Sequence, residues 1–191
     1  SGNSSLINST EGVLYAEIAA LADDGTSRQI SLSDGSNANN KISLRYTSTS
    51  NEVNAFVKSG GSVVFNANEI LSDTTQNNKL ALKFKENDFS FYVNGVQVAT
   101  DTSGNTPTGL NVLDFDSAIG TLNFYGKNKA LAVYKEALTD ANLRCLTYPN
   151  PVATTFDLDF DTIAEQFTFT RGSEATFVNE QGLIESTASN D

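Results

Sequence analysis

The 191-residue sequence contains no histidine and no methionine, and it has a single cysteine and three prolines. Without histidine, Ser-His-Asp triads, Cys-His pairs, imidazole metal ligands and histidine general bases are all excluded. Cys145 has no second cysteine for a disulfide within the chain, and a cysteine-based zinc site is excluded as well. Any catalysis would therefore depend mostly on carboxylate, lysine or tyrosine side chains.

Basic residues are also scarce, with 12 Lys and Arg against 23 Asp and Glu and a formal net charge of −11. Nucleic-acid binding requires a basic surface that displaces counterions, so we expect no nucleic-acid partner. The same charge disfavours anionic membrane surfaces. No apolar run is long enough to span a bilayer, so we expect no membrane insertion. Because a complete translation product begins with methionine, its absence indicates a fragment of a larger protein or a processed chain.

Short segments in which apolar and polar residues alternate recur along the chain, with turn residues between them. The alternation is clear over residues 42–46 and 53–57, and over residues 80–84 apart from one alanine. This period of two is typical of strands with one buried face. Asn94-Gly95 supplies the positive φ angles of a type I′ turn and predicts a hairpin within a three-stranded antiparallel meander. Further strands are expected near residues 110–115, 122–125 and 130–134.

After residue 134 the alternating strand pattern is followed by a predicted helix and a linker. A short helix is predicted over residues 140–146, where Thr139 is placed to cap the N-terminus. Two prolines then mark a linker over residues 149–153. Alternation of apolar and polar residues resumes after the linker, so residues 154–191 are interpreted as the start of a second β unit.

Three segments carry a family resemblance: the meander LALKFKENDFSFYVNGVQVAT, the later LNFYGKNKALAVYKEAL, and the closing LTDANLRCL. In this order they resemble the second half of a laminin-G/concanavalin A-like lectin domain. The resemblance covers residues 5–148, with the first half matching only in the rhythm of its strands. It implies an all-β fold, an antiparallel jelly-roll β-sandwich with one short C-terminal helix.

A second resemblance lies in the C-terminal segment FTFTRGSEATFVNEQGLIES. It is similar to a segment that recurs beside laminin-G-like modules in bacteriophage virion proteins, particularly tail and fibre proteins. Gly172 stands where alanine is commoner in that pattern. The resemblance implies a location in the virion after assembly in the bacterial host cytoplasm. It also implies other virion subunits as partners and a homo-oligomer, which would be a trimer if the protein is a fibre.

Glycan binding usually combines an aromatic face, which contacts the C–H surface of a sugar, with amide and charged groups that bind its hydroxyls. In their predicted strands, Phe56 and Tyr92 alternate with the apolar core positions and therefore point outward. If these strands lie in one sheet, the two rings form a sugar platform flanked by Arg45, Asn54 and Lys58. The alternative is that a loop or a neighbouring subunit covers the same face.

Calcium is the one cofactor that the resemblance suggests, because laminin-G and lectin relatives bind it through aspartates and carbonyls in loops. The alternative is that these aspartates only form turns. The candidates lie in predicted loops or at strand ends: Asp23, Asp24, Asp34, Asp114 and Asp116.

Some members of this fold class are glycoside hydrolases, and those resembling the laminarinase branch carry a Glu-x-Asp-x-x-Glu run, which is absent here. Asp114 and Asp116 are two residues apart and could share a face, but a solvated loop edge is the simpler interpretation. Asp157, Asp159 and Asp161 share a face of their predicted strand, and a solvated strand face is again the simpler interpretation. We therefore predict no catalytic residue.

Three functional hypotheses follow. The leading one is a non-catalytic module of a tail- or fibre-associated phage virion protein, with host-surface glycans as candidate ligands. The first alternative is a purely structural spacer or oligomerisation module. The second is a glycoside hydrolase of the same fold. Fold alone does not separate them, because one sandwich hosts lectins, enzymes and scaffolds.

Overall fold

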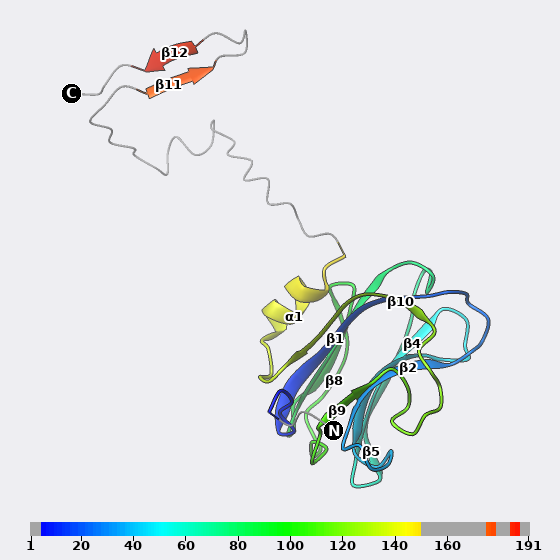
Figure 1. Cartoon of the computed structure of the whole chain (residues 1–191). Helices are drawn as coiled ribbons and strands as arrows, with labels where there is room; N and C mark the ends of the chain where they lie inside the picture. The colour runs from blue at the N-terminus through cyan, green and yellow to red at the C-terminus, as the bar shows by residue number, and fades with distance from the viewer. Residues whose placement is uncertain (1–4, 150–174, 179–183, 188–191) are drawn as a thin grey trace. The chain divides into compact units, whose positions relative to one another are not determined.

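The computed structural model describes residues 5–149, 175–178 and 184–187. The chain divides into two compact units, Ser1–Pro151 and Val152–Asp191. In the second unit, β11 (Ala175–Val178) pairs antiparallel with β12 (Ile184–Thr187), and the rest of the predicted second β unit lies outside the described residues. The first unit is a sandwich of two five-stranded sheets, whose strands can be followed in Figure 1.

Sheet A contains five antiparallel strands in the order β10-β1-β6-β7-β8. The predicted meander is confirmed as β6, β7 and β8. Asn94 and Gly95 have φ angles of 48° and 85° in the turn between β7 and β8, as a type I′ turn requires. The strands of sheet A are β1 (Glu11–Ala20), β6 (Asn78–Lys85), β7 (Phe89–Val93), β8 (Val96–Asp101) and β10 (Gly126–Tyr134).

Sheet B is also antiparallel, with the strand order β5-β4-β3-β2-β9. The strand predicted near residues 122–125 is wrong, because these residues form part of a loop before β10. Leu122 has a φ of 56°, which breaks the extended conformation at the start of that segment. The strands of sheet B are β2 (Arg28–Ser33), β3 (Lys41–Tyr46), β4 (Glu52–Ser59), β5 (Ser62–Ile70) and β9 (Val112–Asp114).

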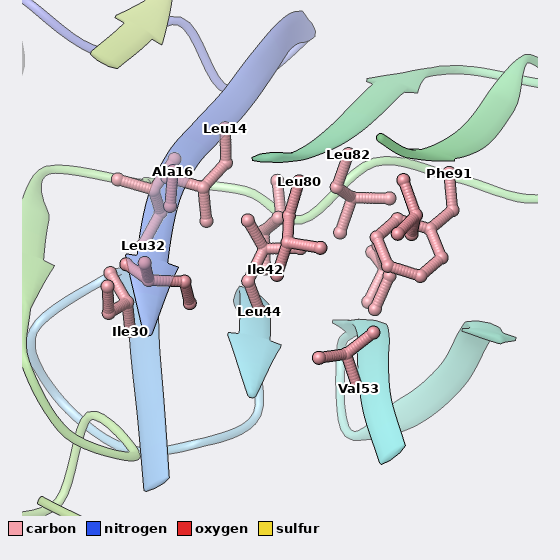
Figure 2. Close-up of a cluster of buried hydrophobic side chains, with 14 of the residues drawn as sticks. Leu14, Ala16, Ile30, Leu32, Ile42, Leu44, Val53, Leu80, Leu82 and Phe91 are labelled. Carbon is pink, nitrogen blue, oxygen red and sulfur yellow. The ribbon is translucent and has the colours of Figure 1, made fainter. Parts of the chain in front are cut away.

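The core lies between the two sheets and is built from every second residue of their strands. Figure 2 shows Leu14, Leu82 and Phe91 of sheet A facing Ile42 and Leu44 of sheet B across this layer. All five side chains are fully buried. Each large side chain removed from water contributes about 1.5–3 kcal/mol of hydrophobic stabilisation. The all-β sandwich that the family resemblance implies is thus the fold of the first unit.

The helix α1 (Asp140–Thr147) covers part of the outer face of sheet A. Its N-terminus is capped as predicted, with the Asn142 N–H donating to Thr139 Oγ1 at 3.3 Å. Leu143 of the helix is fully buried against Val13 of β1 and Tyr92 of β7. Figure 1 shows α1 beside β1, on the side of the sandwich away from β2 and β5. Within the described residues, no helix has the length and hydropathy that a membrane crossing requires.

Candidate functional site

Polar side chains cover the outer face of sheet B. Because the apolar residues of β2, β3 and β4 point into the core, the residues between them point outward. Strand register aligns these residues into three rows across the sheet. We call this set the polar face; its rows are Gln29, Arg45, Asn54 and Asn68; Ser31, Ser43, Phe56 and Asn66; and Ser33, Lys41 and Lys58.

The only aromatic ring in these rows, that of Phe56, lies between two cations. Lys41 Nζ is 5.6 Å from the ring centroid, and the guanidinium carbon of Arg45 is 5.3 Å from it. Both distances allow cation–π attraction. Burial, followed by the positive charges of Arg45 and Lys58, lowers the pKa of Lys41. The centre of the polar face is therefore an aromatic ring in a positively charged setting.

Arg45 is held in place by an amide network. Its Nε donates to Asn54 Oδ1 at 2.7 Å. Asn54 is fully buried, and its Nδ2 donates to Asn66 Oδ1 at 2.7 Å and to the Ala67 carbonyl at 3.1 Å. Asn68 Oδ1 also accepts from Asn54 Nδ2. These contacts occupy the Nε edge of the guanidinium and fix its direction.

Beneath the exposed groups, the polar face has a buried polar floor. Gln29 and Ser43 are fully buried, and neither the Gln29 amide nor Ser43 Oγ has a hydrogen-bond partner within the described residues. A buried polar group without a partner costs about 1–3 kcal/mol. Ser90 Oγ of β7 in sheet A also has no partner among the described residues, so such buried groups lie in both sheets.

A loop over residues 115–125 borders the polar face beside β2. The Gln29 N–H donates to the Leu122 carbonyl at 2.9 Å, and Ser31 Oγ donates to the Asp116 carbonyl at 2.7 Å. Ile119 in this loop is 60% exposed. Sequence reasoning missed this border because it interpreted part of the loop as a strand.

The structure brings together four of the five residues predicted for glycan contact. Arg45, Asn54, Phe56 and Lys58 all belong to the polar face. Tyr92 does not, because it lies on β7 in sheet A and is fully buried beneath α1. That burial, with a smaller contribution from Asp140, raises the pKa of the Tyr92 phenol to about 12. The predicted platform of two rings is therefore wrong.

Several members of the polar face were missed by the sequence prediction. Lys41, Ser43 and Gln29 share the outward positions of their strands with residues that were predicted. The alternation around Ile42 and Leu44 already indicates that Lys41 and Ser43 point outward. What it could not supply was their distance from Phe56, which depends on how β3 pairs with β4.

Three of the aspartates predicted as calcium ligands have hydrogen-bond partners within the protein. Both carboxylate oxygens of Asp24 accept from Arg28 Nη2, at 2.9 and 2.8 Å. Asp23 accepts from the hydroxyl of Ser50, and Asp34 accepts from two backbone N–H groups of the turn that follows it. These contacts are those expected of loop-forming aspartates.

Asp114 and Asp116 remain as a close pair at the edge of sheet B. Burial, followed by the negative charge of Asp116, raises the pKa of Asp114, and Ser33 Oγ lies 3.4 Å from its carboxylate. The described residues contain no group of three or more acidic, cysteine or histidine side chains that could hold a metal ion. The five aspartates therefore do not form one site, and calcium binding stays a prediction. Asp157, Asp159 and Asp161 lie outside the described residues.

Comparison with protein families gives one match. A family model described as the concanavalin A-like lectin/glucanases superfamily matches residues 5–144. No curated protein matches the chain in sequence.

Solved structures share the fold at low sequence identity. The CBM40 of the Ruminococcus gnavus IT-sialidase, bound to α2,3-sialyllactose, has a TM-score of 0.60 and 17% identity over 73% of this chain and 84% of that chain. The leech intramolecular trans-sialidase complexed with 2,7-anhydro-Neu5Ac has a TM-score of 0.60 and 17% identity over 75% of this chain and 24% of that chain. Domains LG4-5 of mouse laminin α1 have a TM-score of 0.52 and 14% identity over 73% of this chain and 40% of that chain. This chain therefore matches only about a quarter of the leech enzyme.

Proposed function

Because the chain belongs to the concanavalin A-like lectin/glucanases superfamily, we propose that it is a non-catalytic carbohydrate-binding module. The observation that carries the proposal is Phe56, a half-buried ring set among amide, hydroxyl and cationic side chains on the outer face of sheet B. The CBM40 that shares this fold was solved with a bound oligosaccharide, which supports the same class of ligand here.

The chemistry of the polar face suits a sugar. A pyranose ring presents C–H groups on its faces and hydroxyls around its edge, so it needs an apolar contact surrounded by hydrogen-bonding groups. Phe56 provides the apolar contact, and the exposed Asn66 beside it provides an amide that both donates and accepts. Arg45 and Lys58 add donors on either side.

The composition of the polar face also supports binding without catalysis. Glycoside hydrolysis generally requires two carboxyl groups flanking the scissile bond. On β2 to β5 the three rows contain amides, hydroxyls and cations, and the one carboxylate in register with them is Asp114 of β9, opposite Ser31 at the edge of the sheet. Glu52 lies beyond the first row, and its oxygens accept from Thr47 at 2.6 Å and from Asn68 at 3.1 Å.

We further propose that the module belongs to a phage virion protein of the tail or fibre and binds glycans of the host surface. The C-terminal resemblance to phage virion proteins supports this location, with other virion subunits as partners. A structural spacer or oligomerisation module is the second candidate. It is favoured by the exposed apolar side chains of the 115–125 loop, among them Phe115 and Ile119.

A glycan array tests the proposed function, with the protein applied in the presence and absence of calcium. We expect saturable binding that falls roughly tenfold or more in Phe56→Ala, because the variant loses the apolar contact. Tyr148→Ala is the matched control, since Tyr148 is a part-exposed aromatic that caps α1 on sheet A. Absence of binding by the folded protein, or undiminished binding by Phe56→Ala, would contradict the proposal. Binding only with calcium would support the calcium prediction.

A further inference from the structure

The positive charge of the polar face contrasts with the rest of the molecule. The chain has 12 basic residues and a net charge of −11, yet Lys41, Arg45 and Lys58 lie together around Phe56. Like charges held this close repel each other, and the repulsion is stronger where water is partly excluded. Keeping all three on one face therefore costs free energy in the absence of an anion.

No carboxylate neutralises these three cations. The ion pairs of the described residues involve Arg28, Lys83, Lys85 and Lys129, and none involves the polar face. Glu52 lies near enough to raise the pKa of Arg45, but burial outweighs it, so that the pKa of Arg45 is lowered. The Glu52 carboxylate makes its hydrogen bonds to neutral groups instead.

The terminal nitrogens of Arg45 are free to bind an anion that presents two oxygens. Its Nε edge is occupied by Asn54, whereas its two terminal nitrogens make no hydrogen bond or ion pair within the described residues. A guanidinium fixed on one edge can present its terminal N–H groups to the two oxygens of one carboxylate, or to two oxygens of a sulfate. The buried, unpartnered Ser43 lies opposite Phe56 in the register, between Lys41 and Arg45 on β3.

We propose that the glycan bound by the polar face carries a negative charge, with its carboxylate or sulfate against Arg45 and its sugar ring against Phe56. This inference rests on the proposed function and names the ligand class of the same site. Lys41 and Lys58 supply longer-range attraction, and Asn54 acts as a positioning residue for Arg45.

Pairs of glycans that differ only in one charged group test the inference. The probes are lactose, 3′-sialyllactose and 3′-sulfolactose, together with N-acetyllactosamine and its sialylated and sulfated forms. Titration calorimetry is done at low and at high sodium chloride. We expect at least one charged form to bind about ten- to a hundredfold more tightly than its neutral parent, and the ratio to fall as salt is added.

Substitutions in the polar face test whether its cations cause the preference for the charged glycan. Arg45→Gln should remove most of the preference for the charged form, and Arg45→Lys should restore only part of it because a lysine cannot form the bidentate contact. Lys58→Gln should weaken the preference through charge alone, which provides a second variant in case Arg45→Gln is unstable. Lys127→Gln, an exposed lysine of sheet A, is the matched control and should leave the preference unchanged.

The outcomes separate this inference from the proposed function. If neutral and charged forms bind equally and Phe56→Ala weakens both, glycan binding stands and the anionic ligand is rejected. If no glycan of the panel binds and the glycan array shows binding to neutral glycans alone, glycan binding stands and the anionic ligand is rejected. If the folded protein binds nothing on either the panel or the array, both proposals are overturned. Preference for sialylated over sulfated probes, or the reverse, identifies the anion.

Discussion

Arg28 is buried at the start of β2, and the carboxylate of Asp24 in the preceding loop neutralises it. The guanidinium also donates to the Thr26 carbonyl at 3.0 Å, so that it ties the loop to the strand. Its hydrogen bond to Asp24, together with those from Thr26, lowers the pKa of Asp24 from 3.8 to about 2. Because Asp24 is exposed, solvent screening keeps the contribution of the pair to stability small.

The ion pair between Asp24 and Arg28 should make the stability of the folded protein depend on pH. The pKa of Asp24 is lower in the folded protein than its ordinary value of 3.8, so the contribution is complete above about pH 4 and is lost as pH falls toward 2. We expect Asp24→Asn to lower the Tm at neutral pH. The difference between wild type and variant should shrink between pH 4 and pH 2, as thermal scans monitored by circular dichroism would measure. A difference that stayed constant across this range would contradict the ion-pair explanation.

The helix α1 covers part of the outer face of sheet A, so the aromatic side chain of Tyr92 on that face is buried. Leu143 closes a small second core with Val13, Tyr15, Ala81 and Tyr92 on the outer face of sheet A. Alternation correctly predicted that Tyr92 points away from the main core. A period of two does not reveal whether a helix covers the outward side, so Tyr92 and Phe56 looked equivalent in the sequence.

The packing of α1 gives a stability prediction. Leu143→Ala should lower the free energy of unfolding by about 2–5 kcal/mol, because the side chain is fully buried and its removal leaves a cavity. Urea denaturation measures the change, and Cys145→Ala, an exposed position in the same helix, should change it by less than about 0.5 kcal/mol. Glycan affinity of the folded Leu143→Ala protein should stay the same, since the helix and the polar face belong to different sheets. Equal effects of the two substitutions would show that the helix is not packed as described.

Some strands could be predicted from the sequence and others could not, because only some have an uninterrupted alternation of apolar and polar residues. Strands with clean alternation, such as β3 and the meander, were found from the sequence. The strand β5 was not, because Val63, Val64 and Phe65 interrupt the period and a register shift occurs opposite them at Val57/Lys58. Bulges and loops depend on how neighbouring strands pair, and a single strand carries little trace of them.

At the scale of the whole molecule, both hydrophobic clusters draw their described members from the first unit. These members lie between Ile7 and Leu146, within the unit Ser1–Pro151. The described core residues and the whole polar face therefore lie within the first unit.

A shortened chain tests whether the first unit folds on its own. We expect residues 1–151 to unfold cooperatively with a Tm close to that of the full chain, because every core residue among the described residues lies in this range. Differential scanning calorimetry measures the transition, and the glycan affinity of the shortened chain should match that of the full chain. A broad transition or lost binding would mean that residues 152–191 complete the fold or the site.

Sequence patterns alone predict the all-β class, the meander, the capped helix and the outward positions of Arg45, Asn54, Phe56 and Lys58. These are local properties, because the side of a strand on which a residue lies depends only on its place in an alternating segment. The pairing of strands in the folded protein places Phe56 and Tyr92 in different sheets and brings Lys41 and Arg45 close to one ring. Strand pairing and helix docking join segments far apart in the chain, so a local alternation of residues does not reveal which outward positions share a sheet or lie beneath α1.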